Sequence, residues 1–376
     1  MSTQNPHAMT VPTPLHAIAS RAHWKAGLDL GSRNTVTMDI RAQRGANANA
    51  VVASWSVPSV VAFQPKALRA DPEAPRAEAI GEEALRRRDH LQLVSPLTCV
   101  EDRRASTLTV FAQALRSSMR ARSGGFPWGV VACPLDADDR TRSDLRAVGN
   151  ELFERMLLVS EQHLLALGLL EDPFREHAIV VDLGASSTRA CVVGGFQGVG
   201  PGAPLPYVSH PFGGDGVDEK LNAQLVAKYP DLVLTAHTLR RLKEQLSFVL
   251  PEKRSSQLRV KLGKSHQMLD VSSLVADSFE PLVATVLHLL AQVILALPRG
   301  LRDAALQRVV LVGGGASTLG LAPRLKSELE KQGFEGTRVV VPEEPQSVVA
   351  LGGARLALLT PDDEWEMPLF ALRPAV

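Results

Sequence analysis

Aromatic residues, cysteine and net charge are all scarce in this chain of 376 residues. Aromatics make up 5% of the sequence, and 41 lysines and arginines balance 40 aspartates and glutamates. Because nucleic-acid binding depends on a basic surface, this balance argues against a nucleic-acid partner. The hydrophobic content of 45% excludes a disordered chain, and the length predicts two or three domains with cores of their own.

The three cysteines, Cys99, Cys133 and Cys191, are far apart in the sequence. Their positions match neither metal-ligand spacing nor a disulfide framework, and the histidines form no metal-ligand pattern either. Apolar residues flank Cys133 and Cys191. We therefore expect buried, reduced thiols in a cytoplasmic protein.

Long uninterrupted hydrophobic runs are also missing. Residues 1–23 mix prolines and polar residues without an apolar core or a basic amphipathic pattern, which predicts a flexible extension and no membrane anchor. The most apolar stretch, residues 281–298, includes His288 and Gln292 among apolar residues at helical spacing. A buried core helix fits this stretch better than a bilayer span, so we expect no direct membrane insertion.

Short apolar runs alternate with amphipathic stretches along most of the chain, which predicts an α/β fold. The expected strands are residues 26–30, 35–40, 57–63, 128–133, 178–183, 189–193, 257–262, 308–312 and 338–341. The expected helices are residues 108–119, 142–156, 217–229 and 321–329, where apolar side chains recur every three or four residues.

One short segment occurs twice, 153 residues apart. The segment Asp29–Thr35 returns as Asp182–Thr188 with the same residue at four of seven positions, and each copy lies between two expected strands. Two strand–turn–strand units at this separation suggest two similar domains, each presenting a hairpin turn.

The small residues in these turns would let backbone N–H groups converge on an anion, as in a phosphate cradle. Ser32, Ser186 and Ser187 add hydroxyl donors, and Asp29 and Asp182 end the first strand of each hairpin. Mg²⁺ keeps several waters and binds one or two carboxylates plus phosphate oxygens, so this set suits a magnesium–polyphosphate site. Ordinary tight turns use the same residue types, so either turn alone is better explained by a structural role, whereas the pair is equally consistent with a phosphate site.

A third glycine-rich turn follows the expected strand 308–312. Gly313, Gly314 and Gly315 stand between that strand and an amphipathic helix, where a flat ligand could approach the backbone closely. The turns match neither the dinucleotide pattern G-x-G-x-x-G nor the Walker pattern, and no G-x-S-x-G hydrolase elbow supports a serine triad. The three turns in this order are a more specific signal of a ligand site than any one turn alone.

These motifs resemble those of the actin and heat-shock-chaperone ATPase superfamily, and within it the MreB/MamK type of bacterial actin. Residues 27–35 resemble the first phosphate loop, 180–188 the second and 310–315 the adenosine motif. Other segments are similar in unbroken order from about residue 25 to 359: 57–62 and 80–84 to segments after the first loop, 158–161 with 167–169 to one connecting helix, 213–218 to the turn after the second loop, 239–248 to the adenosine-side helix, and 349–354 to a second connecting helix.

The resemblance implies an actin-like ATPase fold, in which two similar α/β domains flank a nucleotide cleft. Domain I would span residues 25–160, with a small subdomain at about 50–100. Domain II would span residues 161–359, with a small subdomain at about 215–280. Residues 1–24 would form a flexible extension and residues 360–376 a C-terminal tail.

The resemblance also implies a site for ATP or ADP with Mg²⁺. Asp29 and Asp182 would hold the metal through water, and Glu161 would position the attacking water, so that Glu161 and Asp182 carry the catalysis. The implied nucleotide-binding residues are Asp29, Gly31, Ser32, Arg33, Asn34, Gly184, Ala185, Ser186, Ser187, Gly214, Lys243, Glu244, Gly313, Gly314 and Gly315. Lys243 and Glu244 would meet the ribose and adenine, and the chemistry would be positioning and electrostatics.

The chain departs from the family pattern at three places. Ala185 and Ser186 stand where the second loop usually has glycines, and Arg189 stands where an acidic residue is common. Gln162 follows Glu161 in place of the usual proline. These departures favour slow hydrolysis, or nucleotide binding with little turnover.

The function that the resemblance implies is that of a cytoplasmic cytoskeletal ATPase. The protein would polymerise head-to-tail with copies of itself, hydrolysis would control filament stability, and other proteins would bind or tether the filament. Two alternatives stay open at this point. One is a non-filamentous kinase or chaperone-like ATPase of the same superfamily, and the other is an assembly scaffold that binds nucleotide without turnover.

Overall fold

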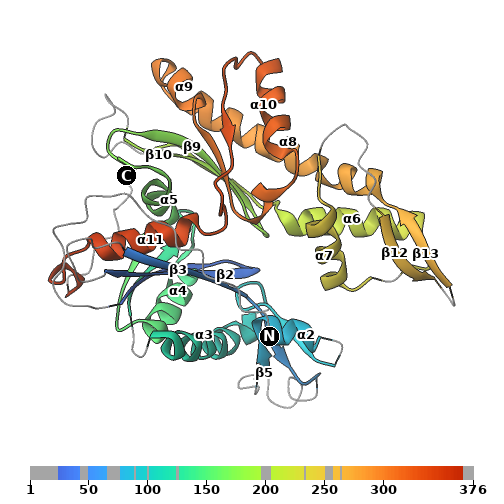
Figure 1. Ribbon diagram of the computed structural model, residues 1–376, viewed down its shortest axis with the longest axis horizontal. Helices are drawn as coiled ribbons and strands as arrows, with labels where there is room; N and C mark the ends of the chain where they lie inside the picture. The colour runs from blue at the N-terminus through green and yellow to red at the C-terminus, as the bar shows by residue number, and fades with distance from the viewer. Residues whose placement is uncertain are drawn as a thin grey trace. The chain divides into compact units, whose positions relative to one another are not determined.

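The computed structural model describes residues 24–42, 50–65, 77–88, 90–99, 101–123, 127–195, 205–232, 234–249, 257–262 and 265–366. The chain forms two compact units. Unit 1 comprises Met1–Pro173 and Ser347–Val376, and unit 2 comprises Phe174–Gln346. Unit 2 is therefore a continuous segment inserted into the chain of unit 1, and Figure 1 labels the elements of both.

Unit 1 is built on a five-stranded sheet in the order β3-β2-β1-β7-β8. The pairs β1–β2 and β2–β3 are antiparallel, whereas β7 runs parallel to both β1 and β8. The strands of unit 1 are β1 (Lys25–Leu30), β2 (Asn34–Ala42), β3 (Ala50–Pro58), β4 (Val61–Phe63), β5 (Ala77–Ile80), β6 (Gln92–Val94), β7 (Trp128–Cys133) and β8 (Arg155–Ser160). The helices are α2 (Gly81–Arg86), α3 (Glu101–Ser123), α4 (Asp139–Leu152), α5 (Glu161–Leu169), α11 (Val348–Leu359) and the short η2 (Glu364–Glu366).

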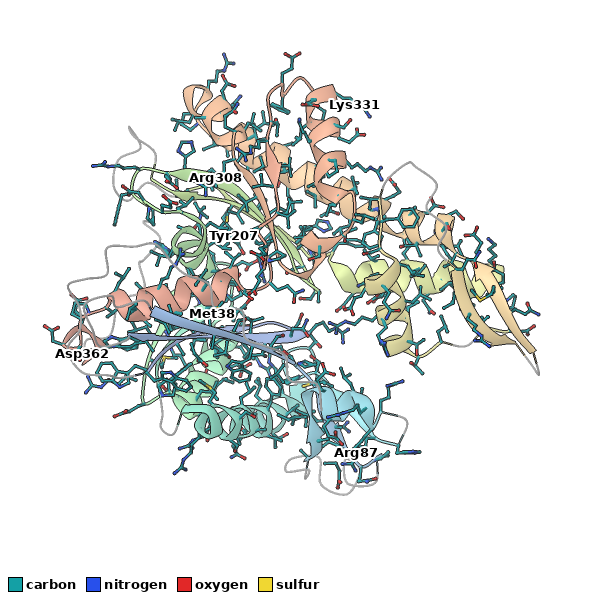
Figure 2. All side chains as sticks on the ribbon, viewed as in Figure 1. Met38, Arg87, Tyr207, Arg308, Lys331 and Asp362 are labelled. Atoms are coloured by element: carbon teal, nitrogen blue, oxygen red, sulfur yellow. The ribbon has the colours of Figure 1, made fainter. Side chains whose placement is uncertain are left out.

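Helices cover both faces of this sheet. On one face, Leu115 of α3 and Leu152 of α4 are buried in a cluster with Leu28 of β1. On the other face, Ala350 of α11 shares a buried cluster with Met38 of β2, which is labelled in Figure 2. A smaller sheet, in the order β5-β4-β6, adjoins α2 and α3.

Helices α5 and α11 cross at close range within unit 1. A Cβ atom at Gly352 of α11 would collide with the carbonyl oxygen of Leu164 in α5, and a Cβ at Gly168 would collide with the carbonyl of Val348. Arg355 donates from its guanidinium to the carbonyl of Leu167 at 2.6 Å, near the end of α5. The glycines therefore allow the backbones to touch, and the arginine binds a carbonyl at the negative end of the α5 dipole.

Unit 2 has a second five-stranded sheet, in the order β11-β10-β9-β14-β15. Across this sheet two antiparallel pairs are followed by two parallel pairs, in the same order as in unit 1. This confirms the expectation of two similar α/β domains. The strands are β9 (His177–Leu183), β10 (Thr188–Gly194), β11 (Tyr207–His210), β12 (Gln257–Leu262), β13 (Ser265–Asp270), β14 (Val309–Val312) and β15 (Val339–Val340). The helices are α6 (Gly214–Lys228), α7 (Ala236–Leu246), α8 (Ser272–Ala296), α9 (Arg299–Leu306), η1 (Gly314–Ser317) and α10 (Leu321–Lys331).

Helix α8 is the central core helix of unit 2. Val286, Leu290 and Val293 are completely buried in a cluster with residues of α6 and β9, as expected for the apolar stretch 281–298. Among the described residues, α8 is also the one helix long and apolar enough to cross a membrane by length and composition. Its buried side chains account for that composition, because an internal helix is apolar on most of its surface.

Three expected elements are wrong in their bounds. The single strand 57–63 is broken at Ser59, because its N–H donates to the carbonyl of Arg33 at 2.8 Å instead of continuing a ladder. The helix 142–156 ends at Leu152, and residues 155–160 form β8 beside β7. Residues 158–160, expected in a connecting helix, are therefore the end of a strand, because a short apolar run has no decisive periodicity.

Two smaller expectations also need correction. Residues 214–218, expected in a turn, form the first turn of α6. Cys133 and Cys191 are buried as expected, but Cys99 is only half-buried. Of the expected N-terminal extension 1–24 and the expected tail 360–376, residues 1–23 and 367–376 lie outside the described residues.

The compact units divide the chain at 173/174 and 346/347. Helix α11 packs on β1 and β7, and helix α5 packs on α11, β7 and β8, which is why both belong to unit 1. The domain bounds expected at 160/161 and 359/360, and the two small subdomains, stay a prediction.

Candidate functional site

The two repeated turns have the same hydrogen bond. Gly31 N–H donates to the carbonyl of Asn34 at 3.1 Å, and Gly184 N–H donates to the carbonyl of Ser187 at 3.0 Å. The strands that lead into each turn also pair in the same register, with residue 30 opposite 35 and residue 183 opposite 188. The sequence repeat is therefore a repeat of backbone structure, one copy in each unit.

Two serines outside the first loop hold its carbonyl groups. Ser59 donates its N–H to the carbonyl of Arg33 at 2.8 Å and its hydroxyl to the carbonyl of Gly31 at 2.7 Å. Ser95 donates its hydroxyl to the carbonyl of Ser32 at 2.9 Å. The carbonyl side of the loop therefore faces the protein. The roles of Ser59 and Ser95 are missed by sequence reasoning, although Ser59 falls within the segment 57–62.

Asp29 and Glu161 lie at the same edge of the unit 1 sheet. Leu28, Val131 and Leu158 are in register across the parallel strands β1, β7 and β8. Asp29 follows Leu28 directly, and Glu161 is the first residue of α5, immediately after β8. Both are half-buried. Glu161 lies in the first turn of α5, at the positive end of the dipole of that helix.

The second loop is supported by the start of α6. Gly214 N–H donates to the carbonyl of Gly184 at 3.0 Å, and Asp215 N–H donates to the carbonyl of Ala185 at 2.8 Å. A Cβ atom at Gly213 would lie 2.6 Å from both of these carbonyl oxygens, so only glycine fits. Gly213 has a structural role here that the sequence did not single out.

Lys243 joins α7 to this region. Its ammonium group donates to the carbonyl of Gly214 at 2.7 Å and lies 3.0 Å from a carboxylate oxygen of Asp218. Burial raises the pKa of Asp218, and the charge of Lys243 opposes that shift. Glu244 instead points to the exposed side of α7, where it pairs with Arg240 at 2.8 Å. The ribose and adenine roles of Lys243 and Glu244 stay a prediction.

The third turn lies against Asp182. Val312 is in register with Asp182 across β14 and β9, and Gly313 follows with a left-handed φ of 79°. A Cβ at Gly313 would lie 2.5 Å from Oδ1 of Asp182, whereas the corresponding position at Gly314 is open, with no heavy atom within 4 Å. Gly313 therefore makes room for the carboxylate, and Gly314 presents backbone to an incoming group.

Asp182 also has a cation beside it. The guanidinium of Arg189 lies 3.7 Å from Oδ2 of Asp182, on the neighbouring strand. Burial raises the pKa of Asp182, and Arg189 opposes that shift. Ser186 is exposed at the tip of the loop, and Ala185 and Ser187 are half-buried.

Each hairpin by itself offers groups that suit a phosphate or a divalent cation. The loops 31–34 and 184–187 have their first carbonyls directed into the protein, which suits the approach of an anion to the backbone N–H side. In the part of the chain that the structure describes, no three His, Cys, Asp or Glu side chains form a ready-made metal site. The carboxylate at the strand end of each hairpin, Asp29 in unit 1 and Asp182 in unit 2, is a ligand of the kind that Mg²⁺ takes together with water and phosphate oxygens.

Comparison with known protein families decides the identity. The model of the MreB/Mbl protein family matches residues 23–361. The chain belongs to the MreB/Mbl family. This membership confirms the resemblance to bacterial actins that the three turns indicated.

Two relatives of this MreB/Mbl chain have low sequence identity to it but match over most of their length. The actin-like protein MamK of Magnetospirillum gryphiswaldense is 24% identical over 344 residues, which cover 90% of each chain. A MamK-like protein of Paramagnetospirillum magneticum is also 24% identical, with 90% of this chain and 96% of the relative covered.

Solved structures establish the actin-like fold of this MreB/Mbl protein. A MamK double helical filament superposes with a TM-score of 0.73 at 24% identity, covering 90% of this chain and 99% of the other. MreB5 of Spiroplasma citri bound to ADP gives a TM-score of 0.65 at 16% identity, covering 88% and 94%. A non-polymerising MamK mutant bound to AMPPNP gives 0.61 at 23% identity, covering 90% and 99%.

Proposed function

We propose that this MreB/Mbl protein is a bacterial actin-like cytoskeletal protein that binds Mg-ATP and polymerises into filaments. The observation that carries the proposal is the repeated loop, which has the same turn hydrogen bond and a carboxylate at the end of a strand in each unit. The MamK relative described as a double helical filament and the MreB5 relative described as bound to ADP support it.

The nucleotide-binding part of the proposal assigns phosphate contacts to residues 31–34 and 184–187. Their backbone N–H groups and the hydroxyls of Ser32, Ser186 and Ser187 would donate to phosphate oxygens. Asp29 and Asp182 would hold Mg²⁺ through water, and the metal would supply positive charge to the phosphate oxygens when bound. Gly313–Gly315 would let the nucleoside lie against the backbone, and Lys243 and Glu244 would contact it.

The catalytic part of the proposal is slow hydrolysis of ATP. Glu161 would accept a hydrogen bond from the attacking water and orient it, while Asp182 would keep the metal in place. The guanidinium beside Asp182 disfavours a second cation at the same carboxylate, so we expect turnover to be low. The same observation favours a second candidate, a nucleotide-binding scaffold with almost no hydrolysis.

The assembly part of the proposal is a head-to-tail homopolymer in the cytoplasm. A contact between two different surfaces of the same chain generates a filament when successive copies do not close into a ring. Nucleotide state can control such a filament only if the polymerised and free forms differ in affinity for ATP and ADP. Other proteins would then bind the filament or tether it in the cell.

Sedimentation and negative-stain electron microscopy with Mg-ATP, with Mg-ADP and without nucleotide test the proposal. We expect filaments with Mg-ATP, and phosphate release that Glu161→Ala slows by about a hundredfold or more, the usual size of such an effect. Glu154→Ala, which changes an exposed glutamate just before β8, is the matched control and should leave phosphate release unchanged.

Two results would contradict parts of this proposal. A protein that stays monomeric in every nucleotide, salt and magnesium condition would exclude the filament. Phosphate release equal to the protein-free blank, for both the wild type and Glu161→Ala, would exclude catalysis and leave the scaffold.

A further inference from the structure

Arg189 faces Asp182 across the second hairpin. The two residues are directly opposite each other in the antiparallel β9–β10 pair, one rung from the Leu183–Thr188 pair that closes the loop. Their side chains are only 22% and 19% exposed, and the guanidinium lies 3.7 Å from Oδ2 of Asp182. The other oxygen, Oδ1, lies against Gly313. Both oxygens of the carboxylate therefore have defined neighbours.

The first hairpin provides an internal reference for this pair. Its aspartate, Asp29, occupies the equivalent position on β1, but the residue directly opposite is Val36. Val36 is buried in the cluster beneath α11. The two hairpins thus agree in backbone, in turn hydrogen bond and in carboxylate, and they differ in the residue across from the carboxylate. A cation stands at that position in unit 2 alone.

The guanidinium of Arg189 can bind groups that the side chain of Val36 cannot. Arginine stays charged at every physiological pH, and its planar N–H fork matches the oxygens of a phosphate as well as those of a carboxylate. A cation held beside Asp182 attracts a polyphosphate at the adjacent loop and repels a second cation at the same carboxylate. The first effect favours nucleotide binding without Mg²⁺, and the second weakens Mg²⁺ binding at that carboxylate. Together they make nucleotide binding depend less on the metal.

We propose that Arg189 is a built-in counter-cation of the unit 2 loop, which pairs with Asp182 in the free protein and with the nucleotide phosphates in the complex. Nucleotide binding to this chain then depends less on Mg²⁺ than it would with an uncharged residue at the same position. This inference rests on the proposed function, because a polyphosphate must bind at residues 184–187.

Isothermal titration of the full-length protein with ATP, in excess Mg²⁺ and in EDTA, tests the inference. For the wild type, we expect removal of Mg²⁺ to weaken binding by less than about tenfold. Arg189→Gln should weaken binding in EDTA by about 10- to 100-fold, the range for one charge-assisted hydrogen bond, and should change the Kd in Mg²⁺ by less than about threefold.

Two variants serve as controls. Arg308→Gln removes a guanidinium that pairs with Glu176 at 2.9 Å just before β14, and should leave the Mg²⁺ dependence at the wild-type value. Figure 2 labels Arg308 on this part of unit 2. Arg189→Lys keeps the charge without the planar fork, and should retain most of the binding in EDTA. It also carries the test if Arg189→Gln proves unfolded in a thermal scan.

Three results would overturn the inference. The first is the same ratio of Kd values, in EDTA and in Mg²⁺, for the wild type and Arg189→Gln. The second is loss of EDTA binding in Arg189→Lys equal to that in Arg189→Gln. The third is wild-type binding that vanishes in EDTA but is normal in Mg²⁺, which leaves the proposed function intact. Absence of ATP binding to the wild type in both buffers would instead remove both the inference and the nucleotide-binding function.

Discussion

At the scale of single residues, the two loops have the same backbone but different supports. The first loop is held by the hydroxyls of Ser59 and Ser95 and by the backbone N–H of Ser59, which all donate to its carbonyls. The second loop is held by backbone N–H groups at the start of α6, which need Gly213 for their close approach. The same turn can therefore be lost by different substitutions in the two units.

Ser59→Ala should destabilise unit 1 and distort the first loop. The Ser59 hydroxyl donates to the carbonyl of Gly31 and also lies 2.8 Å from the hydroxyl of Thr35, which is completely buried. Removing it leaves a buried hydroxyl without that bond, which costs about 1–3 kcal/mol of unfolding free energy. Urea unfolding measures the loss, and Ser56→Ala, at an exposed position of β3, is the control. Equal midpoints for the two variants would refute the prediction.

At the scale of secondary-structure elements, ion pairs between helices add to the buried cores. Arg324 of α10 makes a two-pronged ion pair with Glu280 of α8, with nitrogen–oxygen distances of 2.6 and 2.7 Å. The hydrogen bonds from Arg324 lower the pKa of Glu280 below its ordinary value of 4.5. A lowered carboxyl pKa in the folded state means that the pair stabilises the protein when Glu280 is ionised.

Glu280→Gln should therefore reduce stability in a pH-dependent way. The effect should be fully present above pH 4.5, where the carboxyl group is ionised in the folded and unfolded states, and should disappear as the pH falls through the lowered folded pKa. At neutral pH we expect a loss of only about 0.5–1 kcal/mol, because the Glu280 side chain is 49% exposed and solvent screens the pair. Urea unfolding at neutral and acidic pH measures it, with Glu335→Gln at an exposed position as control. A loss that persists unchanged in acid would contradict this account.

At the scale of the whole molecule, two units of one topology each have a core of their own. Unit 1 depends on α11, which follows unit 2 in the chain, because α11 closes the cluster around Val36, Met38 and Ile40. Unit 2 is continuous, and its core is closed by α8 from within the same segment. A substitution that disrupts the packing of α11 should therefore destabilise the core of unit 1 and leave the core of unit 2 folded.

Ala350→Asp should unfold unit 1 and leave unit 2 protected. Ala350 has no exposed surface, so the substitution places a carboxylate in an apolar cluster without a partner, at a cost of several kcal/mol. Hydrogen exchange followed by mass spectrometry should show lost protection in β1, β2 and β7 and retained protection in β9 and α8. Leu359→Asp, at an exposed position at the end of α11, is the control. Simultaneous loss of protection in both units would show that the two cores unfold as one.

The sequence by itself determined the features that depend on neighbouring residues. It predicted β7 and β12 with their full bounds, the apolar helix within α8, and the repeated turn with its aspartates at positions 29 and 182, because periodicity and turn chemistry are local. It missed β5, β6, β8, β11 and β13, since short strands are defined by the strands with which they pair. For the candidate site, the glycine-rich turns and carboxylates were therefore predictable from the residues themselves.

Only the tertiary structure decided which distant residues meet. Ser59 and Ser95 bind a loop that lies about 30 and 60 residues earlier in the chain, and no local pattern marks a serine for such a bond. The structure likewise decided that Arg189, noticed in the sequence as a departure from the family pattern, lies beside Asp182. Strand register sets that contact, and register follows from the packing of the whole sheet, since a shift of one residue would turn Arg189 to the opposite face.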